Sequence, residues 1–154
     1  MSRGFAMDRN LTILVAEDTE DDALFLERGF RKAGLKNPLQ ILTDGEEVIK
    51  YFKAEGKYED RAKYPFPSVF FTDIKMPKMS GIQLYEKVAA MKPAMRKRFI
   101  FITGDMNSLT SQQMSTVTDN PCLLKPVNIE ELIAVATRAE PQLTRLFTDV
   151  IAQL

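Results

Sequence analysis

The chain has 154 residues, with 21 basic and 21 acidic side chains, 45% hydrophobic and 27% charged residues. This length suits one domain, and the balanced charge argues against nonspecific binding to nucleic acids or membranes. One cysteine leaves no internal disulfide, and neither a membrane-spanning apolar run nor a secretory signal is present, so we expect a cytoplasmic protein. The chain has no histidine, which excludes histidine-based metal sites, catalytic triads and phosphohistidine carriers within it.

Five short apolar runs alternate with segments of helical periodicity. We expect strands at residues 11–16, 39–42, 68–72, 99–103 and 121–124. The expected helices cover residues 20–33, 45–52, 81–91, 107–118 and 128–139, and the fourth of them is weakly apolar. Apolar strands that alternate with helices predict a parallel sheet covered on both faces.

The apolar positions within the expected helices recur at a spacing of three or four residues, which predicts one buried face on each. The residues at this spacing are Ala23, Leu26, Phe30, Ala33, Val48, Ile49, Phe52, Leu84, Val88, Met91, Ile129, Leu132, Ile133 and Ala136.

Residues 53–67 form an irregular connection longer than the usual 4–6 residues. Its aromatic side chains either cover the edge of the sheet or form a loop that docks a partner.

Polar residues stand at the carboxyl ends of four expected strands. In a parallel α/β sheet these ends meet at one edge, where ligands bind at the point of strand-order reversal. The residues placed there are Glu17, Asp18, Asp73, Thr103 and Lys125.

Carboxylates that converge in this way repel one another unless a cation neutralises them, and oxygen ligands favour Mg²⁺. A lysine and a hydroxyl across the crevice suit phosphate oxygens. The set therefore indicates phosphoryl transfer, with Asp73 as the natural carboxylate nucleophile.

Four short motifs carry a resemblance to a known family. They are "AED" (16–18), "TDIKMPKMSG" (72–81), "ITG" (102–104) and "LKP" (124–126). In this order and on these strand ends, they resemble the receiver domain of two-component response regulators, over roughly residues 10 to 139. The opening and the long connection before the third strand are similar to single-domain regulators that partner cyanobacterial phytochromes.

The resemblance implies a role for each residue of the crevice. Asp73 would be the phosphoacceptor, and Glu17, Asp18, Asp73 and the carbonyl of Lys75 would bind Mg²⁺. Thr103 would move onto the phosphoryl group, and Lys125 would pair with a phosphoryl oxygen. The bond from Lys125 to Pro126 is usually cis in the family.

The fold implied is a flavodoxin-like three-layer α/β sandwich with a five-stranded parallel sheet in the order 2-1-3-4-5. The function implied is phosphorelay signalling: a histidine kinase or phosphotransfer protein would donate a phosphoryl group, and an unknown protein target would read the change. The protein's own catalysis would be limited to its phosphorylation and dephosphorylation.

Three residues near the crevice depart from the family pattern or tune it. The aromatic switch residue of the family stands three positions before the lysine, and here that position is Cys122. The coupling from threonine to aromatic ring is then absent or replaced, or Cys122 merely packs in its strand. Lys75 and Asp105 flank the entrance and would either gate it or be surface charges.

Residues 140–154 lie beyond the last helix of an ordinary receiver, and we expect them to form an extra C-terminal amphipathic helix. We expect residues 1–154 to be one receiver domain, whose terminal stripe either folds back on the domain or contacts a partner or a second copy. The residues of the stripe are Leu143, Leu146, Phe147, Val150, Ile151 and Leu154.

Two other functions compete with phosphorelay signalling. A phosphatase with an aspartyl nucleophile needs a second aspartate two residues on, where this chain has Lys75. A receiver-like interaction module that works without phosphorylation is the alternative that Cys122 leaves open.

Overall fold

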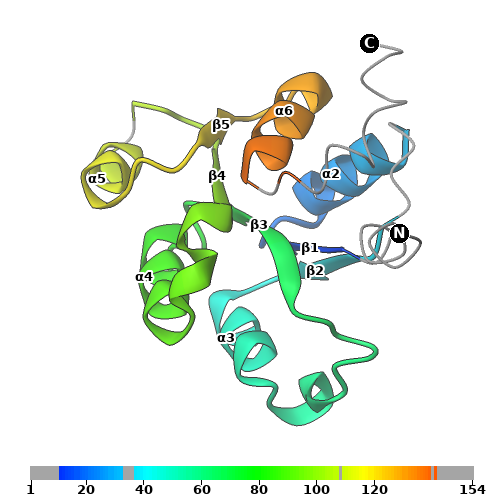
Figure 1. Ribbon diagram of the computed structural model, residues 1–154. Helices are drawn as coiled ribbons and strands as arrows, with labels where there is room; N and C mark the ends of the chain where they lie inside the picture. Colours follow the sequence, from blue (N-terminus) through cyan, green and yellow to red (C-terminus); the bar gives the residue numbers. More distant parts are fainter. Residues whose placement is uncertain (1–10, 33–36, 108, 140, 142–154) are drawn as a thin grey trace.

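A computed structural model describes residues 11–32, 37–107, 109–139 and 141 of the chain (Figure 1). Its centre is a five-stranded parallel sheet in the order β2-β1-β3-β4-β5. Helices lie on both faces of this sheet, which makes three layers. The predicted flavodoxin-like fold and its strand order are confirmed.

The strands begin and end close to where the apolar runs place them. All residues of β1 and β3 are buried, as expected of central strands in a sheet covered on both faces. β5 is one residue shorter than expected: Pro121 lies just before it, although its carbonyl accepts the N–H of Phe101 on β4 at 2.9 Å. The bounds are β1 Thr12–Ala16, β2 Leu39–Leu42, β3 Pro67–Asp73, β4 Phe99–Thr103 and β5 Cys122–Leu124.

Two apolar layers flank the sheet, one on each face. Helices α2 (Glu20–Lys32) and α6 (Ile129–Ala139) cover the layer that contains Phe30, Phe71 and Leu132. Helices α3 (Gly45–Lys53), α4 (Gly81–Met91) and α5 (Leu109–Val117) cover the other layer. Aromatic rings are packed closely in that second layer, where the centroids of Phe70 and Phe99 lie 4.6 Å apart.

Side-chain caps fix where three helices begin. The Asp44 carboxylate accepts the N–H of Glu47 at the start of α3. Ser80 and Gln83 form a reciprocal capping box at the start of α4. The Asn128 side chain accepts two backbone N–H groups at the start of α6, at 2.8 and 3.1 Å. Such caps contribute on the order of 1 kcal/mol each, so these boundaries are well specified by the sequence.

The long connection before β3 is packed rather than projecting. It contains the short 3₁₀ helix η1 (Gly56–Glu59), in which Tyr58 is buried. Tyr58 donates to the Glu47 carboxylate at 2.7 Å, and its ring lies 5.2 Å from that of Tyr51. The Tyr51 hydroxyl donates to the carbonyl of Pro65 at 2.6 Å. These aromatics therefore pack on α3 rather than on an edge strand, and the contacts do not fit a loop that holds Tyr58 out for a partner.

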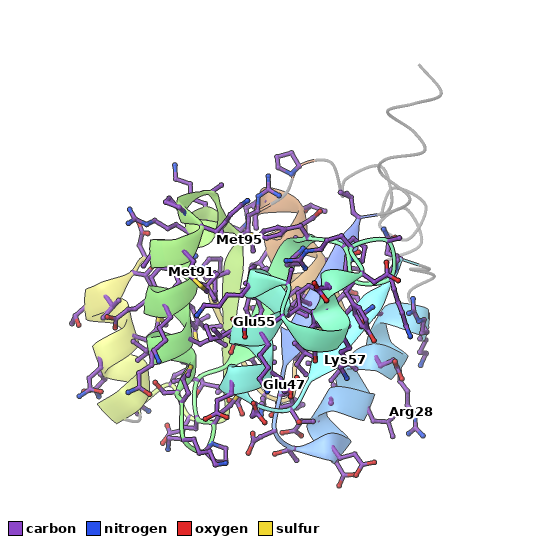
Figure 2. The ribbon with its side chains drawn as sticks, turned by 90° about the horizontal axis from the view of Figure 1, so that it is seen from below. Arg28, Glu47, Glu55, Lys57, Met91 and Met95 are labelled. Carbon is purple, nitrogen blue, oxygen red and sulfur yellow. The ribbon has the colours of Figure 1, made fainter. Side chains whose placement is uncertain are left out.

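Most of the apolar positions expected to face inward do so, but Met91 does not. Met91 is 38% exposed at the last turn of α4, whereas Met95 in the 3₁₀ helix η2 (Pro93–Arg98) is 2% exposed (Figure 2). The chain bends at Lys92 and Pro93, and Met95 rather than Met91 fills the core there. The prediction for Met91 is therefore wrong.

Within the part of the chain that the structure describes, no helix has the length and apolar character needed to cross a bilayer. The amphipathic stripe at residues 143–154 lies outside the described residues. The domain bounds 1–154, 10–139 and 140–154 therefore stay predictions.

Candidate functional site

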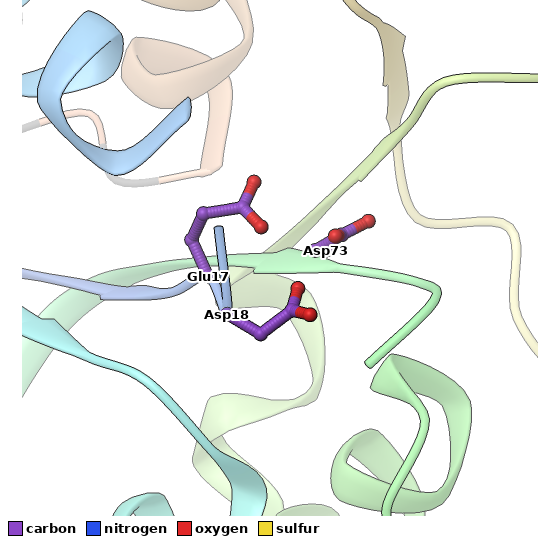
Figure 3. A group of neighbouring side chains, drawn as sticks. All are labelled: Glu17, Asp18 and Asp73. Atoms are coloured by element: carbon purple, nitrogen blue, oxygen red, sulfur yellow. The ribbon is translucent and has the colours of Figure 1, made fainter. Parts of the chain in front are cut away.

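The acidic group of the site arises from the pairing of the two central strands. β1 ends at Ala16 and β3 at Asp73, and the two strands are parallel neighbours with Ala16 opposite Thr72. Glu17 and Asp18, which follow β1, therefore come to lie beside Asp73. Figure 3 shows the three carboxylates turned toward a common space at the carboxyl edge of the sheet.

These three carboxylates have the geometry of a divalent cation site. One oxygen from each of Glu17, Asp18 and Asp73 lies within 4.8 Å of the others. Two oxygens on opposite sides of an octahedral Mg²⁺ are about 4.2 Å apart, so only a small side-chain adjustment would be needed. Glu17 and Asp73 are buried and Asp18 is exposed, which leaves one side of the group open to water. The donor set, which is entirely oxygen, fits Mg²⁺.

Glu17 is the most deeply buried acid of the site, with 1% of its surface exposed. The pKa of Glu17 stands at about 7: burial raises it most, the bond to Lys125 lowers it and the charge of the nearby Asp73 raises it. Its Oε2 accepts the N–H of Thr19 at 3.3 Å, and its Oε1 lies 2.8 Å from the Lys125 ammonium. A cation bound nearby would stabilise the charged form of Glu17, which burial disfavours.

Lys125 binds several carboxylates at once. Its Nζ lies 2.8 Å from Glu17, 2.8 Å from Asp22 and 3.3 Å from Asp73. Burial lowers the pKa of Lys125, but its bonds to Asp22 and Glu17 and the charge of Asp73 outweigh this, so the pKa stands above the usual range. The lysine is therefore a fixed positive charge beside Asp73. The peptide bond between Lys125 and Pro126 is cis, as expected.

Thr103 ends β4 at the same edge, and its hydroxyl is bonded within its own loop. It donates to the carbonyl of Asp105 and accepts the N–H of Asp105, both at 3.2 Å. The hydroxyl would have to leave these partners to reach a group on Asp73. Thr103 lies at the crevice because β4 ends at this edge of the sheet.

The turn after Asp73 explains the sequence "DIKMPKMSG". The N–H of Lys75 donates to the Asp73 carboxylate at 3.3 Å, which fixes one carboxylate oxygen. Lys78 takes a left-handed conformation with φ of 67°, and the N–H of Gly81 returns to the carbonyl of Ile74 at 2.8 Å. A side chain at Gly81 would overlap the carbonyl oxygen of Asp73, so only glycine lets α4 start this close to the strand.

The side chains of the expected gate are both exposed. Lys75 and Asp105 lie on either side of the crevice, and the Asp105 carboxylate accepts the N–H of Asn107 at 2.9 Å. The role of these two residues as a gate stays a prediction, as does the use of the Lys75 carbonyl as a metal ligand.

A cavity of about 520 Å³ opens beside the acidic group, between α2 and the loop from β5 to α6. It brings Lys125 and Asp22 together with the half-exposed ring of Phe25. Its lining residues are Glu17, Asp21, Asp22, Phe25, Leu26, Ile102, Gly104, Lys125, Pro126 and Val127.

Asp22 is the site residue that the sequence did not reveal. The cluster of Glu20, Asp21 and Asp22 fits a helix N-terminus, where acids complement the helix dipole, and needs no other role. The signal that could have singled out Asp22 is its place in the first turn after β1, which puts it next to the end of β5 across the crevice.

The comparisons with known proteins agree with this geometry. The model of the response regulator receiver domain matches residues 13–137. The chain belongs to the response-regulator receiver family. The response regulator receiver protein CpdR of Brucella abortus is 30% identical over 121 residues, which cover 79% of this chain and 89% of that protein. The receiver family is a signalling domain of two-component systems, in which phosphorylation on an aspartate is expected.

Solved structures share the fold of this receiver domain. The phosphorylated cyanobacterial phytochrome response regulator RcpA superposes with a TM-score of 0.69 at 18% identity, over 88% of this chain and 96% of that one. The receiver domain of the sensor histidine kinase PA1611 of Pseudomonas aeruginosa, which has a magnesium ion in its active-site cleft, gives 0.66 at 18% identity, over 84% and 96%. The predicted resemblance to receivers of the phytochrome-partner type is thus confirmed at the level of fold.

Proposed function

We propose that Asp73 accepts a phosphoryl group from a partner histidine kinase or phosphotransfer protein, with Mg²⁺ bound by Glu17, Asp18 and Asp73. The single observation that carries the proposal is the meeting of three carboxylates within 4.8 Å with a lysine ammonium 3.3 Å from Asp73. A bound Mg²⁺ would neutralise the acids and the oxygens of the incoming phosphoryl group.

Asp73, Lys125 and Thr103 each take part in the transfer of the phosphoryl group. A carboxylate oxygen of Asp73 forms the new bond to phosphorus as the bond from phosphorus to the donor imidazole nitrogen breaks, and that nitrogen keeps the electron pair. Lys125 pairs with a phosphoryl oxygen as a point charge. The Thr103 hydroxyl leaves the Asp105 backbone and donates to another phosphoryl oxygen.

Hydrolysis of the aspartyl phosphate, in which water attacks phosphorus and the Asp73 carboxylate leaves, is the other step in which the domain takes part. Asp18 is exposed at the mouth of the site and Asp73 is only 6% exposed, so water would reach the phosphoryl group on Asp73 through a narrow opening. Partners read the phosphorylated state through protein contacts. The cavity between α2 and the loop from β5 to α6 supports docking of the phosphoryl donor there, because it borders Lys125 and displays Phe25.

The test is intact-mass spectrometry after incubation with acetyl phosphate and Mg²⁺. The full chain should gain the mass of one phosphoryl group, and this gain should disappear with EDTA and in Asp73→Asn. A useful control is Asp119→Asn, which removes an exposed acid that precedes β5, away from the carboxyl edge of the sheet, and should leave the gain intact. No gain in the unaltered protein would favour the alternative of an interaction module that works without phosphorylation.

A further inference from the structure

Asp22 binds the lysine of the site from outside the group of metal-binding acids. Its Oδ2 lies 2.8 Å from Lys125 Nζ, as close as Glu17 at 2.8 Å and closer than Asp73 at 3.3 Å. It comes from α2, whereas the acids assigned to the cation follow β1 and end β3. The Asp22 side chain is 43% exposed, so it reaches the lysine from the solvent side.

An ammonium group has three N–H donors, and in this structure Lys125 faces three carboxylates. Two of these, Glu17 and Asp73, are the groups expected to turn toward Mg²⁺. Asp22 is the one that can keep its bond to Lys125 when a cation binds. We infer that Asp22 is a positioning residue that competes with the metal-binding acids for Lys125, and so favours binding of Mg²⁺ while opposing binding of the phosphoryl group. This inference rests on the proposed function.

Loss of the Asp22 charge should weaken the binding of Mg²⁺ and strengthen the binding of the phosphoryl group. Without the charge of Asp22, Lys125 would pair only with Glu17 and Asp73 and would compete with Mg²⁺ for them, and one negative charge that attracts Mg²⁺ would be lost. The same change would favour an anionic phosphoryl group, since Lys125 would be released from a competing carboxylate and a repelling charge would be gone. Because Asp22 is partly exposed, screening limits each effect to about threefold to fivefold.

The experiment measures both affinities by calorimetry on the full chain, which has no tryptophan to serve as a fluorescent reporter. Mg²⁺ is titrated first, and beryllofluoride, a phosphoryl mimic, is then titrated at Mg²⁺ saturation for each variant. In Asp22→Asn we expect the Kd for Mg²⁺ to rise and the Kd for beryllofluoride to fall, each about threefold to fivefold. Asp22→Glu, which keeps the charge, should restore both values toward those of the unaltered protein.

The matched control is Asp21→Asn, which removes the same charge from the same helix turn without touching Lys125. It should shift either Kd by less than half as much. Equal shifts in the two asparagine variants, or weaker binding of both ligands in Asp22→Asn, would overturn the inference, since the first indicates net charge alone and the second indicates structural damage. Melting temperatures verify that the variants are folded.

The two proposals fail in different ways. An unaltered protein that binds neither Mg²⁺ nor beryllofluoride contradicts the proposed function and the inference with it. An unaltered protein that binds both ligands, with no opposite shifts in Asp22→Asn, contradicts the inference alone.

Discussion

Cys122 stands three residues before Lys125, where the resemblance to other receivers leads one to expect an aromatic ring. It is partly buried on β5 and packs in the aromatic layer covered by α3, α4 and α5. Tyr85 of α4 packs in the same layer, with its ring 5.1 Å from that of Phe99. A thiol of this size cannot swing between buried and exposed states as a ring does, so any aromatic movement in this layer has to come from another residue.

The Cys122 thiol should react slowly and with an unusual dependence on pH. Burial raises its pKa to about 11, and only the thiolate is nucleophilic. The fraction of thiolate at pH 8 is then about 100-fold below that of a thiol with a pKa near 9. We expect the rate of iodoacetamide alkylation to rise about tenfold per pH unit from pH 7 to 10 without levelling off near pH 9, as measured by intact mass. Rapid alkylation of the native protein at pH 8, comparable to the rate in urea, would contradict this.

At the level of single residues, the sequence predicted which side chains meet but not how they bond. Glu17, Asp18, Asp73, Thr103 and Lys125 come together because parallel strands end at one edge, a rule that needs no coordinates. The pairing of Asp22 with Lys125 was missed, because a helix N-terminus already accounts for acids there. The orientation of the Thr103 hydroxyl was also beyond the sequence, since it depends on the local path of the loop that carries Asp105.

The elements of the fold were predicted to within one or two residues wherever a cap or a change of periodicity marks the end. α4 begins at Gly81 because Ser80 and Gln83 close its first turn, and the sequence shows this. The packed 3₁₀ segments η1 and η2 were not predicted, because short helices of this kind lack a hydrophobic period. The burial of Met95 in place of Met91 follows from η2 and was missed with it.

The link between α5 and β5 depends on one amide side chain. Asn120 donates to the carbonyls of Arg96 and Phe99, and its oxygen accepts the hydroxyl of Thr118 at 2.7 Å. It thereby joins the start of β5 to the end of η2. Asn120→Ala should lower the free energy of unfolding by about 1–3 kcal/mol, since two carbonyl groups lose their donor.

Urea unfolding at equilibrium measures this change. Asp119→Ala, at the exposed neighbouring position, is the control and should change stability by less than about 0.5 kcal/mol. An equally stable Asn120→Ala protein would mean that water replaces the amide at no cost.

For the whole molecule, the cation should act as a stabilising ligand. Three acids held close together repel one another, and a cation that binds only the folded state shifts the unfolding equilibrium by mass action. At 100 times its Kd, Mg²⁺ should raise the free energy of unfolding by about 2.7 kcal/mol. The measurement is thermal unfolding in EDTA and at increasing Mg²⁺ concentration.

Asp18→Asn provides the control for this prediction, because Asp18 is the exposed member of the group and its loss disturbs little packing. The variant should fold in EDTA and gain much less stability from Mg²⁺. If the melting temperature of the unaltered protein did not change with Mg²⁺ concentration, this would argue against a cation site at these acids.

The architecture as a whole was the part most securely predicted. Alternating apolar strands and amphipathic helices permit few topologies, and right-handed crossovers reduce them further. What the sequence leaves open is association: the phosphoryl donor, the target and a possible homodimer depend on surfaces of other molecules, and the stripe at residues 143–154 lies outside the described residues.

The close approach at Gly81 makes the two sides of the crevice unequal. On one side, the first turn of α4 is capped by its own residues and rests on the backbone of Asp73, which leaves it little freedom to slide. On the other side, Thr103 leads into a loop and then into α5, whose last residue, Val117, is 44% exposed. A new charge on Asp73 would therefore rearrange the loop and α5 while α4 stays in place. A partner would then detect the change on the surface formed by α5 and this loop.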